Sequence, residues 1–195
     1  EPVRINVIEP SGERAIAFDP ALFDYGKNKF EPQALSGVGF NGFRVHYAIN
    51  RPGYKDEVVV FQGASYFRAI AKGQNYGLSA RGLALNTADT RGEEFPFFRS
   101  FWIERPRPEA STIVVHALLD SDSTTGAYRF TIRPGDVTVM DVELTLYPRL
   151  ALPYVGLASL TSMYFFGAND RAGIDDFRPA VHDSDGLAIW NGRGE

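Results

Sequence analysis

Apolar and polar residues alternate with a period of two along most of this chain. The alternation is clear in Val3–Val7, Phe43–Tyr47, Tyr128–Ile132 and Val137–Leu146. Successive side chains of a β-strand point to opposite faces, so this period is typical of strands that bury one face. The pattern therefore predicts a series of half-buried strands rather than helices.

Turn-forming residues separate these runs at short intervals. The sequence contains 19 glycines and 12 prolines, which gather in segments such as 51–53, 104–108 and 133–136. Many short strands between turns are typical of an antiparallel sandwich, so we predict an all-β fold of that kind. Two stretches, 63–73 and 160–167, fit either a short helix or a strand flanked by glycines.

The composition predicts a globular domain that can bury a core. Of the 195 residues, 44% are hydrophobic, and the formal net charge is −4. Acidic and basic residues are spread along the whole chain, so no basic stripe favours nucleic acid or an anionic membrane as a partner. No apolar stretch approaches the roughly 20 residues that a membrane-spanning helix needs. We therefore expect no nucleic-acid partner and no membrane span.

The residues that most metal and cofactor sites require are scarce. There is no cysteine, and the histidines are His46, His116 and His182. The glycine-rich nucleotide motifs, the zinc-protease motif and the serine-hydrolase elbow are absent from the sequence. We accordingly predict no cofactor and no metal site.

The segment "VHDSDGL", residues 181–187, concentrates a histidine and two acids before a glycine. Asp183 and Asp185 could share a calcium ion, although the loop lacks the further acids of an EF-hand. Asp183 could instead act as a general acid or base, with His182 tuning its proton affinity. A third interpretation is a polar turn that satisfies its own backbone. The residues alone leave these three interpretations open.

A second group combines aromatic rings with arginine and carboxylate side chains. Such a mixture suits a carbohydrate cleft, because a sugar ring offers an apolar face for stacking and a rim of hydroxyls for hydrogen bonds. A buried aromatic strand with surface charges is the alternative, and Phe97 and Phe98 fit that alternative best. The group consists of Tyr66, Tyr76, Arg81, Glu93, Glu94, Phe95, Phe97, Phe98, Phe101, Trp102, Glu104 and Arg105.

Five longer motifs resemble one known family along almost the whole chain. They are "GASYFRAIAKGQNYGLSARGLALNTA", "GEEFPFFRSFWIERP", "ALLDSDSTTGAYRFTIRPG", "LTSMYFFGAN" and "RPAVHDSDGL". Together they closely resemble the periplasmic glucan biosynthesis proteins of the G and D types, which belong to the osmoregulated periplasmic glucan system of Gram-negative bacteria.

The resemblance implies a fold, a location and a substrate. It implies a large β-sandwich similar to galactose mutarotase, followed by a smaller immunoglobulin-like domain, in a protein exported to the periplasm. Residues 1–195 would then form part of the N-terminal glucan-processing domain, and the immunoglobulin-like domain would lie outside this chain. Members act on β-1,2-glucan as anomer-inverting endo-glucanases or as transglycosylases that cyclise the glucan. A non-catalytic factor that presents the glucan for branching or decoration is the alternative function.

The resemblance also implies roles for particular residues. It places a catalytic carboxylate on Asp183, on the general-base side, and we expect the partner acid to lie beyond Glu195. We further expect six residues to line the glucan groove, namely Tyr66, Tyr76, Arg81, Trp102, Arg178 and His182.

The end of the sequence, residues 191–195, contains no terminating element, and we interpret it as a cut within a longer domain. A fragment of this kind would be inactive or a weak glucan binder, and its unpaired strand edges would favour self-association. The full-length protein could also contact the glucan-synthesis machinery.

Overall fold

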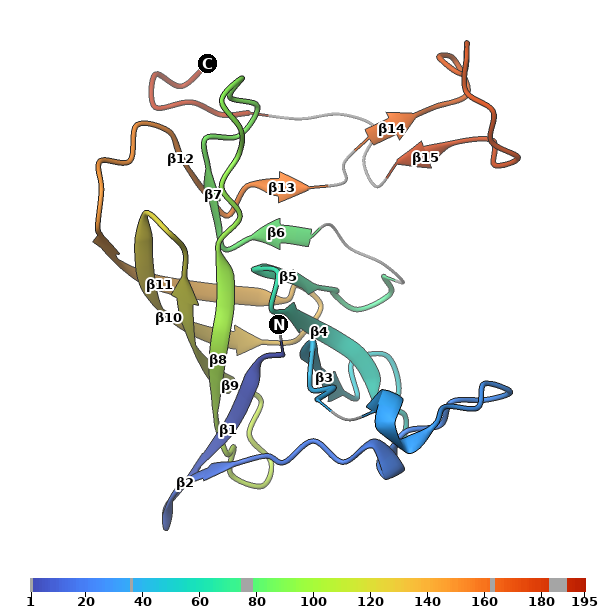
Figure 1. Cartoon of the computed structure of the whole chain (residues 1–195), viewed down its shortest axis with the longest axis vertical. Helices are drawn as coiled ribbons and strands as arrows, with labels where there is room; N and C mark the ends of the chain where they lie inside the picture. The colour runs from blue at the N-terminus through green and yellow to red at the C-terminus, as the bar shows by residue number, and fades with distance from the viewer. Residues whose placement is uncertain (1, 36, 75–78, 162–163, 183–188) are drawn as a thin grey trace.

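Two facing β-sheets enclose one apolar core (Figure 1). The computed structural model describes residues 2–35, 37–74, 79–161, 164–182 and 189–195. Within these ranges the helical segments are two short 3-10 turns, Pro20–Leu22 and Pro32–Leu35, and no helix is long and apolar enough to span a bilayer. The predicted all-β sandwich is therefore confirmed.

The larger sheet has six strands in the order β11-β10-β9-β8-β1-β2. Its neighbours pair antiparallel except β1 and β8, which run parallel with Arg4 opposite Ser100 and Ile8 opposite Glu104. A parallel pair needs a long crossover, and here the chain forms most of the second sheet between β1 and β8. The strands are β1 (Arg4–Glu9), β2 (Gly12–Ala15), β8 (Phe97–Glu104), β9 (Ile113–Asp120), β10 (Thr124–Arg133) and β11 (Val139–Pro148).

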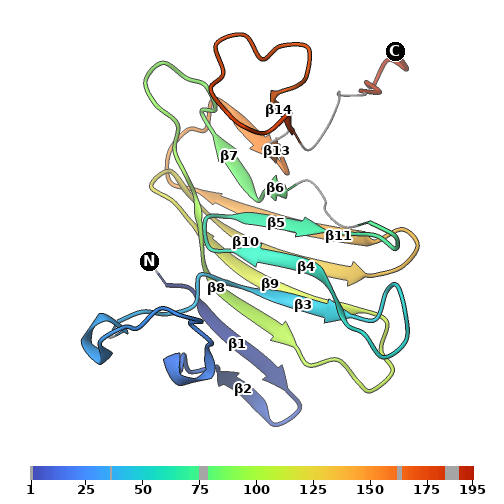
Figure 2. The ribbon, with the colours of Figure 1, turned by 90° about the vertical axis from the view of Figure 1, so that its right-hand side faces the viewer.

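The second sheet has five antiparallel strands in the order β13-β6-β5-β4-β3. These strands are β3 (Gly42–Tyr47), β4 (Asp56–Gln62), β5 (Tyr66–Ala69), β6 (Ser79–Arg81) and β13 (Leu160–Thr161). Two further antiparallel pairs lie beyond β6 and β13 (Figure 2). They join β7 (Leu83–Leu85) to β12 (Val155–Leu157) and β14 (Tyr164–Phe166) to β15 (Val181–His182).

Phenylalanine rings from both sheets interlock in the core. The Phe61 ring of β4 lies 4.9 Å from that of Phe130 and 5.7 Å from that of Phe101, both in the six-stranded sheet. All three side chains are completely buried. Burying one such side chain contributes about 1.5–3 kcal/mol, so this cluster is a main source of the attraction between the sheets.

A β-bulge in β8 changes which aromatic side chains face the core. The register shifts between Phe98 and Ser100, so Phe98 and Phe101 both point inward although they are three positions apart. Phe98 is completely buried, as predicted. Phe97 is only half-buried, and the Arg99 guanidinium lies 5.6 Å from its ring centre.

One hydrogen bond ties the two sheets together across the core. The buried Tyr128 hydroxyl on β10 donates to the Gly82 carbonyl, between β6 and β7, at 2.7 Å. Burial raises the pKa of Tyr128, so the phenol stays protonated and keeps donating. A Cβ at residue 82 would lie 2.7 Å from the Phe98 ring, which explains why glycine occupies this junction.

The structure also decides between helix and strand in the two ambiguous stretches. Residues 66–69, within the stretch 63–73, form β5, and the described part of the stretch 160–167 forms β13 and β14. The runs predicted as strands from their alternation correspond to β1, β3, β10 and β11. In each case tertiary pairing agrees with the alternation of the sequence.

Candidate functional site

Tyr66 and Arg81 lie side by side on the outer face of the five-stranded sheet. They are cross-strand partners on β5 and β6. Their neighbours Phe67 and Ala80 pack in the core, and alternation therefore turns Tyr66 and Arg81 to the opposite face. Figure 2 looks onto this face, with the six-stranded sheet behind it.

Two hollows on this face share Val60 and Arg68. The smaller, about 30 Å³, adjoins Tyr66, and the larger, about 320 Å³, extends toward the turn between β3 and β4. Ser79, the cross-strand partner of Arg68, also lines the smaller hollow. An aromatic ring among hydrogen-bonding side chains in a shallow depression matches the two kinds of surface that a sugar presents.

Arg81 is buried at the end of this face. Its side chain is 9% exposed and forms an ion pair with Glu93. The guanidinium carbon lies 5.0 Å from the centre of the Phe95 ring, and the Arg81 amide donates to the Ser159 carbonyl at 2.9 Å. Among the described residues, the buried Nε has no hydrogen-bond partner. A guanidinium held this firmly fixes the positions of Glu93 and of the Phe95 ring.

The hairpin of β14 and β15 projects from the β13 end of the sheet on the side of this outer face (Figures 1 and 2). His182 on β15 stacks against Tyr164 on β14, with ring centres 5.3 Å apart. The Tyr164 hydroxyl donates to Asp170 at 2.8 Å, and the Gly167 amide donates to the same carboxyl oxygen at 2.6 Å. The Gly167 amide, then Tyr164 and the nearby His182, lower the pKa of Asp170.

The loop between these strands is held by two arginines. Arg171 donates to the backbone carbonyls of Asp176 and Arg178, and its guanidinium lies 5.4 Å from the Phe166 ring centre. Arg178 forms a forked contact with Asp176, with Nη2 to Oδ2 at 2.6 Å and Nε to Oδ1 at 2.9 Å. These hydrogen bonds lower the pKa of Asp176 to about 2. Arg178 therefore lies on the loop that leads to His182, with its charge paired locally.

Trp102 lies on a different surface from Tyr66 and Arg81. Its neighbour Phe101 is in the core, so Trp102 points to the outer face of the six-stranded sheet, where its indole Nε1 donates to Glu13 at 2.8 Å. The structure does not bring Trp102 together with the other described candidates. Its predicted contact with glucan stays a prediction.

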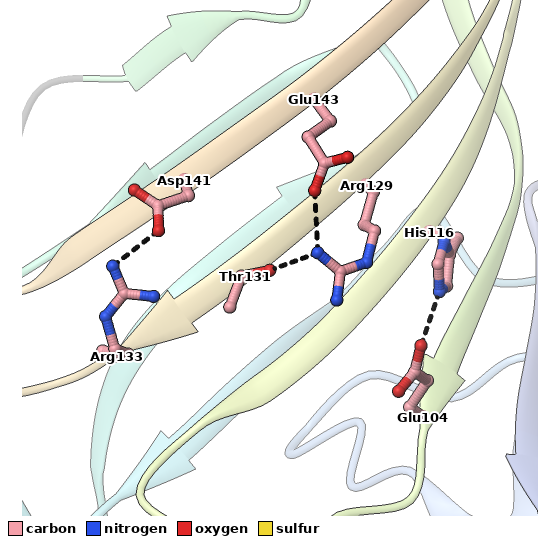
Figure 3. A network of polar contacts seen from close by, with 7 residues as sticks. All are labelled: Glu104, His116, Arg129, Thr131, Arg133, Asp141 and Glu143. Atoms are coloured by element: carbon pink, nitrogen blue, oxygen red, sulfur yellow. Dashed lines mark hydrogen bonds and ion pairs between the residues drawn. The ribbon is translucent and has the colours of Figure 1, made fainter.

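Charged pairs cover the same outer face of the six-stranded sheet (Figure 3). Arg129 donates to Glu143 at 2.8 Å and Arg133 to Asp141 at 2.6 Å, both between β10 and β11. His116 lies 2.8 Å from a Glu104 oxygen. These side chains satisfy one another across the strands.

Two of the predicted site residues, Asp183 and Tyr76, lie outside the described residues. Within the described ranges, no group of three or more histidine and carboxylate side chains could hold a metal ion. The calcium interpretation of residues 181–187 involves Asp185 as well, which also lies outside those ranges.

Sequence reasoning missed three residues that shape this site. Arg68 could have been found from the alternation that places it on the same face as Tyr66. Tyr164 and Asp170 carried no usable signal, because their contacts with each other and with His182 depend on how a long loop returns to β14. Their contribution can be recognised only in the folded β14–β15 hairpin.

The chain resembles known proteins over its whole length. It matches the family described as "Periplasmic glucan biosynthesis protein, MdoG" across residues 1–195. It is 58% identical over 195 residues to glucans biosynthesis protein G of Ralstonia nicotianae, an alignment that covers 100% of this chain and 39% of that protein.

Two further relatives carry the same name. Identity to glucans biosynthesis protein G of Bradyrhizobium diazoefficiens is 66% over 158 residues, covering 81% of this chain and 31% of the relative. For Rhodopseudomonas palustris strain BisA53 it is 64% over 173 residues, covering 89% and 34%. The chain thus spans between about a third and two fifths of the length of these relatives. It belongs to the MdoG family of periplasmic glucan biosynthesis proteins.

Proposed function

We propose that the protein processes β-1,2-linked glucan in the periplasm and binds it on the outer face of the five-stranded sheet. The observation that carries the proposal is the Tyr66–Arg81 pair, which stands on a hollowed polar face next to the hairpin that bears His182. Family membership in glucan biosynthesis supports the class of ligand. Tyr66 would stack on a sugar ring, and Arg81 would donate to hydroxyls.

Asp183 is the proposed catalytic carboxylate. It follows His182 directly in the sequence, and His182 stacks against Tyr164. In an inverting endo-glucanase one carboxylate activates water while a second carboxylic acid protonates the leaving oxygen, with about 6.5–9.5 Å between them. Asp183 would be the base, and the acid would come from beyond Glu195. A cyclising transglycosylase would replace the water with a hydroxyl of the same glucan chain.

The remaining candidates have supporting roles in the proposal. Arg178 and Tyr76 would contribute hydrogen bonds and stacking along the glucan, together with His182. Trp102 would contribute only if the glucan also reached the outer face of the six-stranded sheet.

The test is to incubate the full-length protein and its Asp183→Asn variant with linear β-1,2-glucan. Product length and anomeric form would be followed by mass spectrometry and NMR. We expect shorter linear or cyclic products from the wild type and a loss of about 10²–10⁴-fold in rate in the variant, the usual contribution of a general base. Near-native turnover in the variant would remove Asp183 from the mechanism. Binding without any change in chain length in either protein would favour the non-catalytic presenting factor.

A further inference from the structure

A cleft that is separate from the two hollows lies next to Arg81, between the loop 86–95 and the turn that joins β9 to β10. Its volume is about 750 Å³, within the range of about 300–1,000 Å³ that is typical of small-molecule sites. Its lining is mostly polar and charged, and it includes Asn86, Arg91, Arg99 and Asp122. Phe95 contributes an aromatic ring to the same lining and is 58% exposed.

Phe95 is held in place although it is exposed. The Arg81 guanidinium supports its ring, and Arg81 is fixed in turn by its ion pair with Glu93. Pro96 follows it and restricts its backbone to extended conformations. Phe95 therefore presents one face of its ring to the cleft in a fixed position, which is what a stacking contact requires.

Glu94 fixes the other side of the same segment. Its carboxylate accepts hydrogen bonds from the Ser121 hydroxyl, from the Ser123 amide at 2.9 Å and from the Ser123 hydroxyl at 2.6 Å. Its own amide donates to the Leu85 carbonyl at 3.2 Å. The two walls of the cleft are thereby tied together, so the position of Phe95 is set before any ligand arrives.

The polar groups around Phe95 suit neutral hydroxyls better than an anionic ligand. Arg91 is held by Asp89 through Nε to Oδ1 at 3.0 Å and Nη2 to Oδ2 at 2.7 Å, and Asp120 lies 3.8 Å from Arg99. The lining carries two guanidiniums against five carboxylates, so it disfavours an anion and offers many acceptors to hydroxyl groups. The five acids are Asp89, Glu93, Glu94, Asp120 and Asp122. An exposed aromatic ring among hydrogen-bonding groups complements the apolar face and the hydroxyls of a pyranose ring.

We propose that this cleft is an additional sugar-binding subsite in which Phe95 stacks on a glucose unit of the glucan chain. The inference rests on the proposed function, because it takes the ligand to be β-1,2-glucan. Arg81 contacts the Phe95 ring and belongs to the outer face that carries Tyr66, so one glucan chain can cross from that face into the cleft. The subsite therefore adds affinity for long glucans and leaves short ones unaffected.

The test measures binding in the full-length protein, in an Asp183→Asn background so that the glucan is not consumed. Isothermal titration would compare a long and a short linear β-1,2-glucan for Phe95→Ala, Phe95→Trp and Tyr147→Ala. Tyr147 is the matched control, because it is also 58% exposed but does not line the cleft. We expect Phe95→Ala to weaken binding of the long glucan about tenfold, the loss that corresponds to about 1.4 kcal/mol. Phe95→Trp should bind normally, and Tyr147→Ala should stay within about twofold.

Three outcomes would overturn the subsite. Equal binding by Phe95→Ala and Tyr147→Ala would show that the ring takes no part. A tryptophan at position 95 that acrylamide cannot quench in the glucan-free protein would show that another segment of the protein fills the cleft. No binding of β-1,2-glucan by the background protein would overturn the subsite and the proposed ligand together, and this result differs from the first because Tyr147→Ala would then show no binding either.

Discussion

The two outer faces of the sandwich differ in how their polar side chains are arranged. On the six-stranded sheet, Arg129 and Arg133 each pair with an acid on the neighbouring strand, so the charges satisfy one another. On the five-stranded sheet, Tyr66 borders a hollow, and Arg81 contacts Phe95, which lines the neighbouring cleft. The five-stranded face also has a cross-strand pair, Arg44 with Glu57 at 2.7 Å, but this face is hollowed beside Tyr66, and a hollow gives a ligand room to form hydrogen bonds. This difference is why we place glucan on the five-stranded sheet.

The largest effect is expected when an arginine is replaced by methionine on each face in turn. Arg81→Met leaves Glu93 without its partner in a partly buried site, and breaking a buried pair costs about 3–5 kcal/mol. Because Glu93 keeps some contact with water, we expect a loss of about 3 kcal/mol in the free energy of unfolding. Arg129→Met should cost less than about 1 kcal/mol, since its pair is exposed. Urea unfolding of both variants measures this, and equal losses would remove the distinction between the faces.

The next test compares Tyr66→Ala with Trp102→Ala. Tyr66 borders the proposed glucan groove, and the loss of one stacking ring should weaken glucan binding about tenfold. Trp102 stands on the other face with its indole bound to Glu13, and we expect its replacement to change the affinity less than about twofold. Titration of both variants with the same glucan decides the matter. A larger effect at Trp102 would mean that glucan reaches the six-stranded sheet.

Acid should loosen the loop beside the groove. Asp176 has its pKa lowered to about 2 by hydrogen bonds from Arg178, so the ionised pair stabilises the loop at pH above 3.8. That contribution is lost as the pH falls from 3.8 through about 2. In Arg178→Gln we expect the pKa of Asp176 to rise toward 3.8 and the acid sensitivity of the loop to shrink. A carbon-13 NMR titration of the Asp176 carboxyl measures this, and an unchanged pKa would show that the backbone holds the carboxylate instead.

The smallest effect is expected within the charged pairs of the six-stranded face. A double-mutant cycle on Arg133 and Asp141 should give a coupling free energy below about 1 kcal/mol, because both side chains are well exposed. Added salt should reduce it further. Chemical denaturation at low and high salt is the measurement. A coupling that exceeds this value and resists salt would show that the face is shielded in the full-length protein.

Local pattern predicted the strands but not their partners. The alternation in Phe43–Tyr47 and Tyr128–Ile132 was enough to predict β3 and β10, because each residue's face depends only on its neighbours. The parallel pairing of β1 with β8 joins segments far apart in sequence, and no short motif encodes it. The bulge after Phe98 is a similar case, since it reverses the phase of the alternation within one strand.

Some residues of the candidate site could likewise be predicted from the sequence, and others could not. Tyr66 and Arg81 were predicted and the structure places them as cross-strand partners, although their role in binding stays a prediction. Grouping by aromatic and charged character also selected Trp102, because composition does not say on which side of a sheet a residue lies. The positions of Phe101 and Trp102 next to each other already implied opposite faces. Tyr164 and Asp170 could be found only from the folded hairpin.

The parallel pairing of β1 with β8 also constrains the order in which the six-stranded sheet can form. β1 ends at Glu9 and β8 begins at Phe97, so a long stretch of chain must be brought back before the two strands can pair. Until then the first strand has only its hairpin with β2. A chain that folds from its first strands therefore leaves one edge of β1 unpaired until β8 is in place, and unpaired edges favour pairing with other chains.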